Sequence, residues 1–221
     1  MRAIFSYVLA AAGAAMLAAG AHAERVDRLA VSIERSAIME SEILDHLRVA
    51  AFLEGKPLDV TPRARRAAAG QLIELELIHR EMELSRYTPP GTEIAVPLLK
   101  KFREEHYPDE AKYQAALAAN NLREADLLRN LLLQVTITRF INYRFKPGVR
   151  VLESEIEEYY RTSFVPGWES VKSPVPVPPL EEARAEIEAT LTDQKVDQAM
   201  DDWLKAATAS VRITYREEVF R

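Results

Sequence analysis

The chain has 221 residues, with 29 basic and 34 acidic side chains and a net charge of −5 at pH 7. A mildly acidic protein without a basic run is a poor candidate for binding nucleic acid or an anionic membrane surface. The absence of Cys excludes disulfides, thiol catalysis and thiolate metal sites, so a conventional packed core must hold the fold.

The first 23 residues have the three parts of a secretory signal peptide. Arg2 supplies a positive start, residues 4–17 are apolar, and residues 21–23 read Ala-His-Ala, a small-x-small cleavage site. An uncleaved anchor is the alternative, but the apolar run is shorter than the ~20 residues that a spanning helix needs. Cleavage before Glu24 leaves 198 of the 221 residues, with 28 basic against 34 acidic side chains and a net charge of −6. We therefore expect an exported protein with residues 24–221 as its mature chain.

The mature chain opens with a hairpin and a helix. Leu29, Val31 and Ile33 alternate with Arg28, Ala30 and Ser32, which predicts a half-buried strand. Residues 34–36 turn into a short return strand over 37–39. Residues 41–53 carry apolar side chains at helical spacing and stop before Gly55 and Pro57, so a helix is expected there.

Helices fill the middle of the chain. Thr61 and Pro62 form a helix start, with Thr as the N-cap and Pro at the first helical position, and this helix is expected to run to about Ser85. The Pro-Pro-Gly break at 89–91 is followed by a helix that begins or kinks at Pro97. A short helix is expected from Asp109, its N-cap, through Ala119, with a left-handed stop at residues 120–121.

The stretch 122–145 predicts the helix around which the others are arranged. It has neither Pro nor Gly, and its apolar residues cover more than one face. Such a helix is covered on several sides as a central core helix, or it lines a groove for another molecule. Both descriptions can hold at once, with one end in the core and the aromatic end, 140–145, presented to a ligand.

The last third of the chain contains two further helices and a strand. Residues 147–148 form a corner, and a helix follows from Glu153 with several carboxylates in its first turn. Residues 165–179 hold five of the twelve prolines and predict an extended linker or loop. A helix over 180–207 and a terminal strand over 211–215 complete the chain.

The hairpin at the front and the strand at the end each need a partner, since neither is stable alone in water. We expect them to pair with one another. The predicted fold is therefore mostly α: one multi-helix unit closed by a small antiparallel sheet that the two ends of the mature chain build together.

Catalytic and metal-binding patterns are not evident. The carboxylate pairs, such as Glu155 with Glu158, sit among other charges on helices, as on a solvated face. His46, His79 and His106 form no pair at metal-ligand spacing, and the seven glycines form no phosphate-binding loop. We expect no catalytic residues, no metal site, no cofactor and no small-molecule substrate.

Aromatic side chains are concentrated between residues 143 and 168. They either pack in the core or form a surface that binds polypeptide through flexible apolar contacts. The candidate binding residues are Tyr143, Phe145, Tyr159, Tyr160 and Phe164, with Trp168 close by.

At several places the chain resembles the SurA-type periplasmic chaperones. The resemblance covers most of the mature chain, and the order of the segments is more specific than any one of them. These segments are 26–31 and 38–43 for the opening hairpin and first helix, 71–78 with Glu81 for the second helix, 139–141, 149–151 and 155–160 for the approach to the isomerase module, and 179–182, 195–196, 203–204 and 211–213 for the C-terminal helix and strand.

The chain departs from that family in two ways. A parvulin-type prolyl isomerase module follows the Tyr-Tyr helix in the family, whereas only residues 161–178 occupy that place here, far fewer than the ~50 residues of a small domain. Met39, Arg123 and Leu152 stand where the family usually has a Ser or Thr cap, each a loss of about 1 kcal/mol if the cap forms.

The resemblance implies an ATP-independent chaperone, or holdase, in the bacterial periplasm. Its partners are then unfolded polypeptides, outer-membrane proteins among them, bound in an apolar groove by the five aromatic residues given above. Two alternatives stay open. One is a peptidyl-prolyl isomerase, by family likeness, and the other is a non-catalytic envelope adaptor with one fixed partner. A homodimer is also possible, because a second copy can cover excess apolar helix surface.

Overall fold

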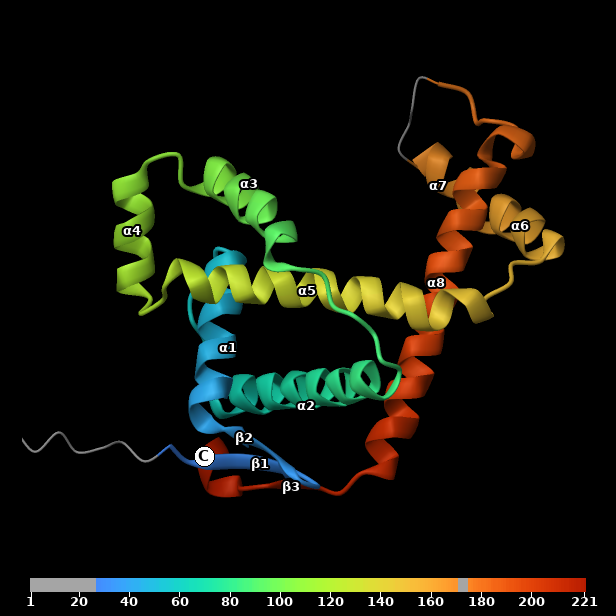
Figure 1. Cartoon of the computed structure of the whole chain (residues 1–221). Coiled ribbons are helices and arrows are strands. Elements are labelled where there is room, and N and C mark those ends of the chain that lie inside the picture. Colours follow the sequence, from blue (N-terminus) through green and yellow to red (C-terminus); the bar gives the residue numbers. More distant parts are fainter. Residues whose placement is uncertain (1–26, 171–174) are drawn as a thin grey trace, which may run out of the picture.

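A computed structural model describes residues 27–170 and 175–221, and the predicted signal peptide lies outside these ranges. The described chain is mostly helical with one small antiparallel sheet (Figure 1). Strand β1 (Leu29–Ile33) lies between β2 (Ser36–Met39) and β3 (Ile213–Tyr215). Val31 pairs with Ile38 on one side and with Tyr215 on the other. The prediction that the opening hairpin and the final strand pair is confirmed.

One detail of the first strand differs from the sequence pattern. Ala30 was expected on the exposed side, yet Ala30 and Val31 are both fully buried. The register of the β1–β2 pairing shifts between Leu29 and Val31. Such an irregularity interrupts the strict alternation of faces along a strand. The short 3-10 helix η4 (Glu217–Phe220) follows β3, and its Phe220 packs in the same cluster as Ala30 and Val31.

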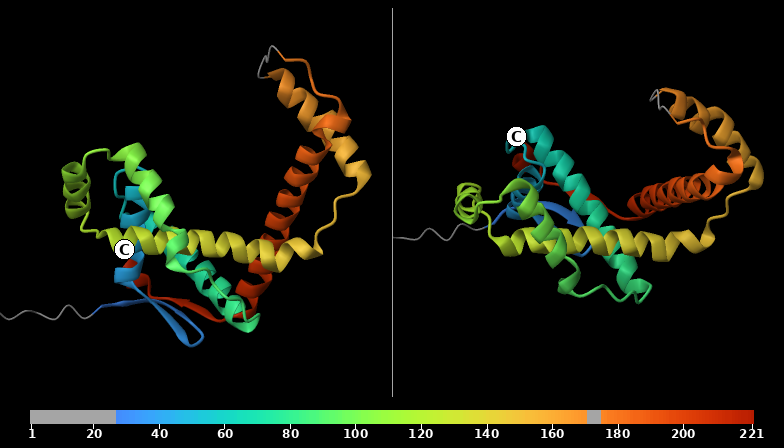
Figure 2. Two further views of the ribbon diagram at one scale, coloured as in Figure 1. Left: turned by 45° about the horizontal axis from the view of Figure 1, so that its top comes forward. Right: turned by 90° about the horizontal axis from the view of Figure 1, so that it is seen from above.

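Four helices form a frame, the name used below for α1 (Glu40–Leu53), α2 (Pro62–Leu84), α5 (Glu124–Phe145) and α8 (Leu180–Ser210). Figure 1 shows α1 near one end of α2 and α5 and α8 near the other, and the view from above in Figure 2 shows α2 crossing α5 at an angle. The Thr61 hydroxyl accepts a hydrogen bond from the Ala64 amide at 3.3 Å, which confirms the predicted start of α2.

A group of shorter helices covers the α1 end of α5. The 3-10 turn η1 (Thr92–Ile94) leads into α3 (Val96–His106), which has its proline in the first turn as expected, and α4 (Glu110–Ala119) follows. The carboxylate of Asp109 caps α4, and Asn121 has a positive φ of 53° at the predicted left-handed stop.

The other end of the molecule carries an arm. After η2 (Lys146–Gly148), helix α6 (Glu153–Tyr159), the π-helical turn η3 (Tyr160–Phe164) and α7 (Val165–Ser170) follow one another. Helix α6 and the turn η3 pack on the N-terminal half of α8. Figure 2 shows this arm projecting from the frame in two further views. The prediction of an extended linker or loop over 165–179 is wrong for residues 165–170, which form α7, and residues 171–174 lie outside the described ranges. The Pro-rich residues at 175–179 are non-helical, as expected.

The three positions where a capping Ser or Thr was missing use half of a capping box instead. Met39, Arg123 and Leu152 are the N-caps of α1, α5 and α6. In each case the carboxylate three residues later accepts a hydrogen bond from the N-cap amide, at 2.7, 2.9 and 2.8 Å. These acids also favour the positive end of each helix dipole, so part of the expected capping loss is offset.

The core consists of several clusters rather than one. The sheet, α1, α2 and η4 pack around Val31, Ile43 and Val219. The first part of α5 packs with α1, α3 and α4 around Tyr113 and Leu127. The last part of α5 packs with α2 and α8, and the arm has its own small cluster around Ile187.

Candidate functional site

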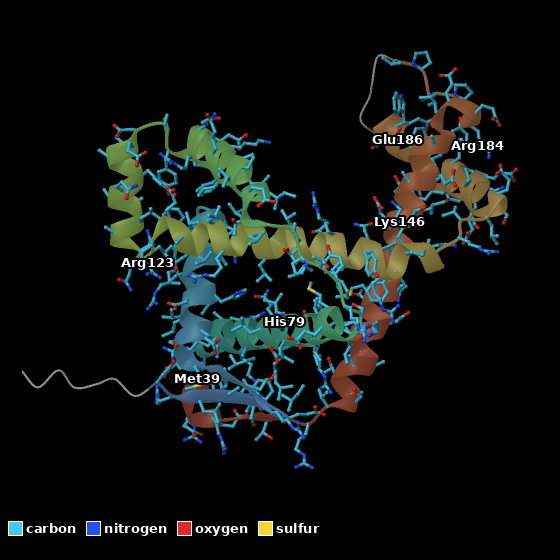
Figure 3. All side chains as sticks on the ribbon, viewed as in Figure 1. Met39, His79, Arg123, Lys146, Arg184 and Glu186 are labelled. Carbon is cyan, nitrogen blue, oxygen red and sulfur yellow. The ribbon has the colours of Figure 1, made fainter. Side chains whose placement is uncertain are left out.

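An apolar groove lies between α2 and α5, in the middle of the frame. Its volume is about 230 Å³. Figure 3 draws the side chains of both helices, with His79 labelled on α2. The residues that line it, here called the α2–α5 groove, are Leu75, Ile78, His79, Met82, Pro89, Arg129, Leu132, Leu133, Thr136 and Ile137.

The polar groups of this groove have hydrogen-bond partners in the protein or are exposed to water. Thr136 is buried, and its hydroxyl donates to the Leu132 carbonyl at 2.8 Å, one turn back along α5. His79 and Arg129 are exposed, so they stand at the edge with access to water. Because the Thr136 hydroxyl already has a hydrogen-bond partner, an apolar side chain that fills the groove leaves this hydroxyl satisfied.

The exposed apolar residues continue beyond the groove. Leu133 is 40% exposed and Tyr143, farther along α5, is 56% exposed. The Tyr143 ring lies 5.3 Å from that of Tyr87, which lies 5.2 Å from that of Phe140. Phe140 belongs to the same cluster as the groove residues Ile78 and Met82. Tyr143 therefore adds an exposed ring to the part of α5 that follows the groove.

The aromatic end of α5 is for the most part not presented. Phe140 is fully buried and Phe145 is 9% exposed. Phe145 packs with Val196, Met200 and Trp203 of α8, whose indole ring lies 6.1 Å away. The expectation that residues 140–145 are presented as a unit is thus wrong. Helix α8 needs an apolar partner where it crosses α5, and Phe145 supplies it.

The other three predicted aromatic residues lie on the arm. Tyr159, Tyr160 and Phe164 are half-buried and pack against Ile156 and Ile187. The five candidates are thus divided between the exposed face of α5, the α5–α8 contact and the arm. Among the described residues, the lining of the α2–α5 groove contains none of the five.

Two further cavities, each more polar than the α2–α5 groove, lie beside the tip of the hairpin. They have volumes of about 400 and 520 Å³ and share Glu34, Leu77 and Arg80. Arg80 Nη1 and the Glu34 carboxylate are 2.8 Å apart, so this ion pair lies in the lining of both cavities. The second cavity, with Glu76, His79 and Glu83 also in its lining, suits water better than an apolar side chain, whereas the first also contains Leu84, Trp203 and Val211.

Shifted titratable groups are explained by structural contacts. A hydrogen bond from Lys195 lowers the pKa of Glu155, and one from Arg123 lowers the pKa of Asp126. Burial raises the pKa of Tyr113 to about 12, beneath the guanidinium of Arg103. Within 27–170 and 175–221, no group of three or more acidic or His side chains is placed to hold a metal ion.

The sequence contained a signal for the groove. The groove residues Leu75, Ile78, Met82, Leu132 and Ile137 belong to the apolar residues of α2 and α5, which cover more than one face of each helix. Sequence reasoning identified that excess but named the aromatic residues as binding contacts. The groove depends on which pairs of helices face each other, and apolar periodicity alone does not determine this.

In the described part of the chain, no helix combines the length and the apolar composition needed to cross a bilayer. The sequence matches no family model and no curated protein.

Proposed function

We propose that this chain is an ATP-independent periplasmic chaperone that holds unfolded polypeptides, including outer-membrane proteins, by their apolar segments. The observation that carries the proposal is the α2–α5 groove, an apolar surface open to solvent in a frame of packed helices. The resemblance of the sequence to the helical core of SurA-type chaperones supports the same proposal.

The size and chemistry of the groove suit side chains of varied sequence. Ligand pockets usually measure about 300–1,000 Å³, so 230 Å³ fits one or two apolar side chains better than a whole small molecule. Apolar contacts are non-directional. Met82 is flexible and polarisable, which lets the wall adapt to different side chains.

The expected affinity fits a chaperone that releases its client without ATP. Burial of one large apolar side chain contributes about 1.5–3 kcal/mol. Two such side chains contribute about 3–6 kcal/mol before ordering costs, against the roughly 4 kcal/mol of a millimolar dissociation constant. A single segment therefore exchanges rapidly. A long client presents several such segments, so several chaperone molecules cover it at once while each contact exchanges rapidly.

A matched pair of substitutions tests the proposal. Leu133 lines the groove and is 40% exposed, whereas Leu98 lies on α3, outside the groove, and is 39% exposed. Gln is a good helix former, so Leu133→Gln and Leu98→Gln should both fold. The assay is light scattering of an urea-denatured outer-membrane β-barrel protein after dilution into buffer with the chain in severalfold excess.

The wild type and Leu98→Gln are expected to suppress aggregation, and Leu133→Gln to suppress it much less. Absence of suppression by the wild type would refute the holdase function. Equal suppression by both variants would refute the assignment of the groove.

Two further measurements separate the alternatives. Recovery of one stoichiometric partner in a pull-down, instead of a spread of clients, would favour the envelope adaptor. Sedimentation equilibrium tests the homodimer: a dimer that Leu133→Gln dissociates would mean that a second copy covers the groove, whereas the chaperone proposal expects the groove to be available to clients.

A further inference from the structure

A second aromatic surface lies on the arm, separate from the α2–α5 groove. The rings of Tyr160 and Phe164 are stacked, with centroids 5.7 Å apart and planes at 19°. The rings of Phe164 and Trp168 are stacked in the same way, 5.8 Å apart at 28°. These three half-buried rings form a continuous apolar strip along η3 and α7, called here the aromatic ladder.

The π-helical turn aligns this ladder. In an α-helix each residue advances by about 100°, so side chains four residues apart drift by about 40° per step. Tyr160 to Phe164 is a π turn, which has more residues per turn than an α turn. Four residues therefore complete less than a full turn there, whereas four residues of an α-helix complete slightly more than one. The next step, from Phe164 to Trp168, is α-helical. The opposite drifts of the two steps offset each other, so the three rings share one face.

The segment lying against the ladder has a sequence that enforces polyproline II geometry. It reads Val-Pro-Val-Pro-Pro over 175–179. Proline fixes φ near −65°, and a residue before proline is confined to extended conformations. Each of the residues 175–179 is a proline or precedes one. Pro179 has φ −62° and ψ 156°, close to the polyproline II values of about −75° and +145°.

The ladder donates two hydrogen bonds to this segment. Trp168 Nε1 donates to the Val175 carbonyl at 2.9 Å, and the Tyr160 hydroxyl donates to the Pro178 carbonyl at 2.8 Å. The two carbonyls are three residues apart, which is one turn of a polyproline II helix, so they point the same way. Prolines offer carbonyl acceptors and no amide donors. Flat rings with donors at both ends match that surface.

We propose that the aromatic ladder is a binding site for proline-rich segments in the polyproline II conformation, occupied in this chain by residues 175–179. A proline-rich segment of another polypeptide competes for the same rings and donors. This site is independent of the holdase proposal, because its residues lie on the arm and that test uses Leu133 on α5.

The competition can be measured on the whole chain. The double substitution Pro176→Gly and Pro178→Gly removes the conformational restriction and weakens the internal ligand. The probe is a fluorescein-labelled peptide with two copies of Val-Pro-Val-Pro-Pro, followed by fluorescence anisotropy. A short tether gives an internal segment an effective concentration in the millimolar range. The double variant is therefore expected to bind the probe about tenfold or more tightly than the wild type does.

Matched variants test the individual donors in that background. Tyr160→Phe and Trp168→Phe keep a ring in the stack and remove one donor each, so each should weaken binding severalfold. Tyr159→Phe, a neighbouring half-buried ring on the same arm, should leave binding unchanged. A peptide with alanine in place of every proline should bind at least tenfold more weakly.

Several results would overturn the proposal. These are no binding of the probe by the double variant at millimolar concentration, equal binding of the alanine peptide, or equal effects of Tyr159→Phe and Tyr160→Phe. Circular dichroism of each variant confirms that its helices are retained, so a loss of binding reports on the ladder.

Discussion

The C-terminal turn η4 packs against the opening hairpin and the first two helices, and Phe220→Ala measures how much this packing contributes to the free energy of unfolding. Phe220 is 7% exposed and packs with the buried residues of β1, α1 and α2. Its ring lies 5.7 Å from that of Tyr215, and the guanidinium carbon of Arg66 is 5.5 Å from its centre. Truncating a buried Phe costs about 3–5 kcal/mol, because a cavity remains where the ring was.

That loss is large against the about 5–15 kcal/mol by which folded domains are stable. It should lower the melting temperature by roughly 6–20 °C, at about 2–4 °C per kcal/mol for a chain of this size. Urea unfolding followed by circular dichroism gives the free energy. Leu84→Ala is the control, since Leu84 is 71% exposed and its truncation should cost less than about 0.5 kcal/mol. A cost below about 1 kcal/mol for Phe220→Ala would refute the inference that the two ends share one core.

Three further predictions concern other parts of the chain. Asp126→Ala should cost about 1 kcal/mol at neutral pH, because the Asp126 carboxylate accepts from the Arg123 amide. The folded-state pKa of Asp126 is lowered from 3.8, so the stabilisation is complete well above pH 3.8 and should disappear as the pH falls through the lowered pKa; urea titrations at pH 7 and pH 3 check this. Ile187→Ala removes a fully buried side chain of the arm cluster and should speed amide exchange in α6 and α7 while leaving β1 protected, whereas uniform acceleration would contradict a separate arm. A proline-peptide isomerisation assay should give the background rate, and a rate that rises with the concentration of the chain would favour the isomerase alternative.

Local rules predicted most of the fold. The starts of α2 and α4 follow from Thr61 and Asp109, and the stop before α5 follows from Asn121, because capping chemistry is written in neighbouring residues. The pairing of β1 with β3 followed from the instability of isolated strands. The error over residues 165–170 has the opposite cause. The prolines of that stretch suggested an extended chain, but residues 153–170 are helical without a break, and Pro166 directly follows the π-helical turn η3, where the regular α-helical hydrogen-bond ladder is already interrupted.

The candidate site was less predictable, because burial of an aromatic residue depends on tertiary partners. Phe145 and Tyr143 are two residues apart on one helix, yet α8 covers the first and leaves the second 56% exposed. The apolar excess on α2 and α5 was compatible with a core helix or with a groove. Predicting where the groove lies requires the arrangement of α1 and α8 around α2 and α5, which a single sequence does not give.

The frame also explains why the groove remains open. Leu127 packs with α1 and its neighbours near one end of α5, while Phe140 packs with α2 and α8 near the other. Thirteen residues separate them, about 20 Å along the helix. The lining residues of α5, from Arg129 to Ile137, fall between these two contacts. Because both ends are anchored by buried side chains, closing the middle would require disrupting a packed cluster. A groove held open in this way loses little freedom when a side chain enters, so the modest apolar contact it offers is available for binding.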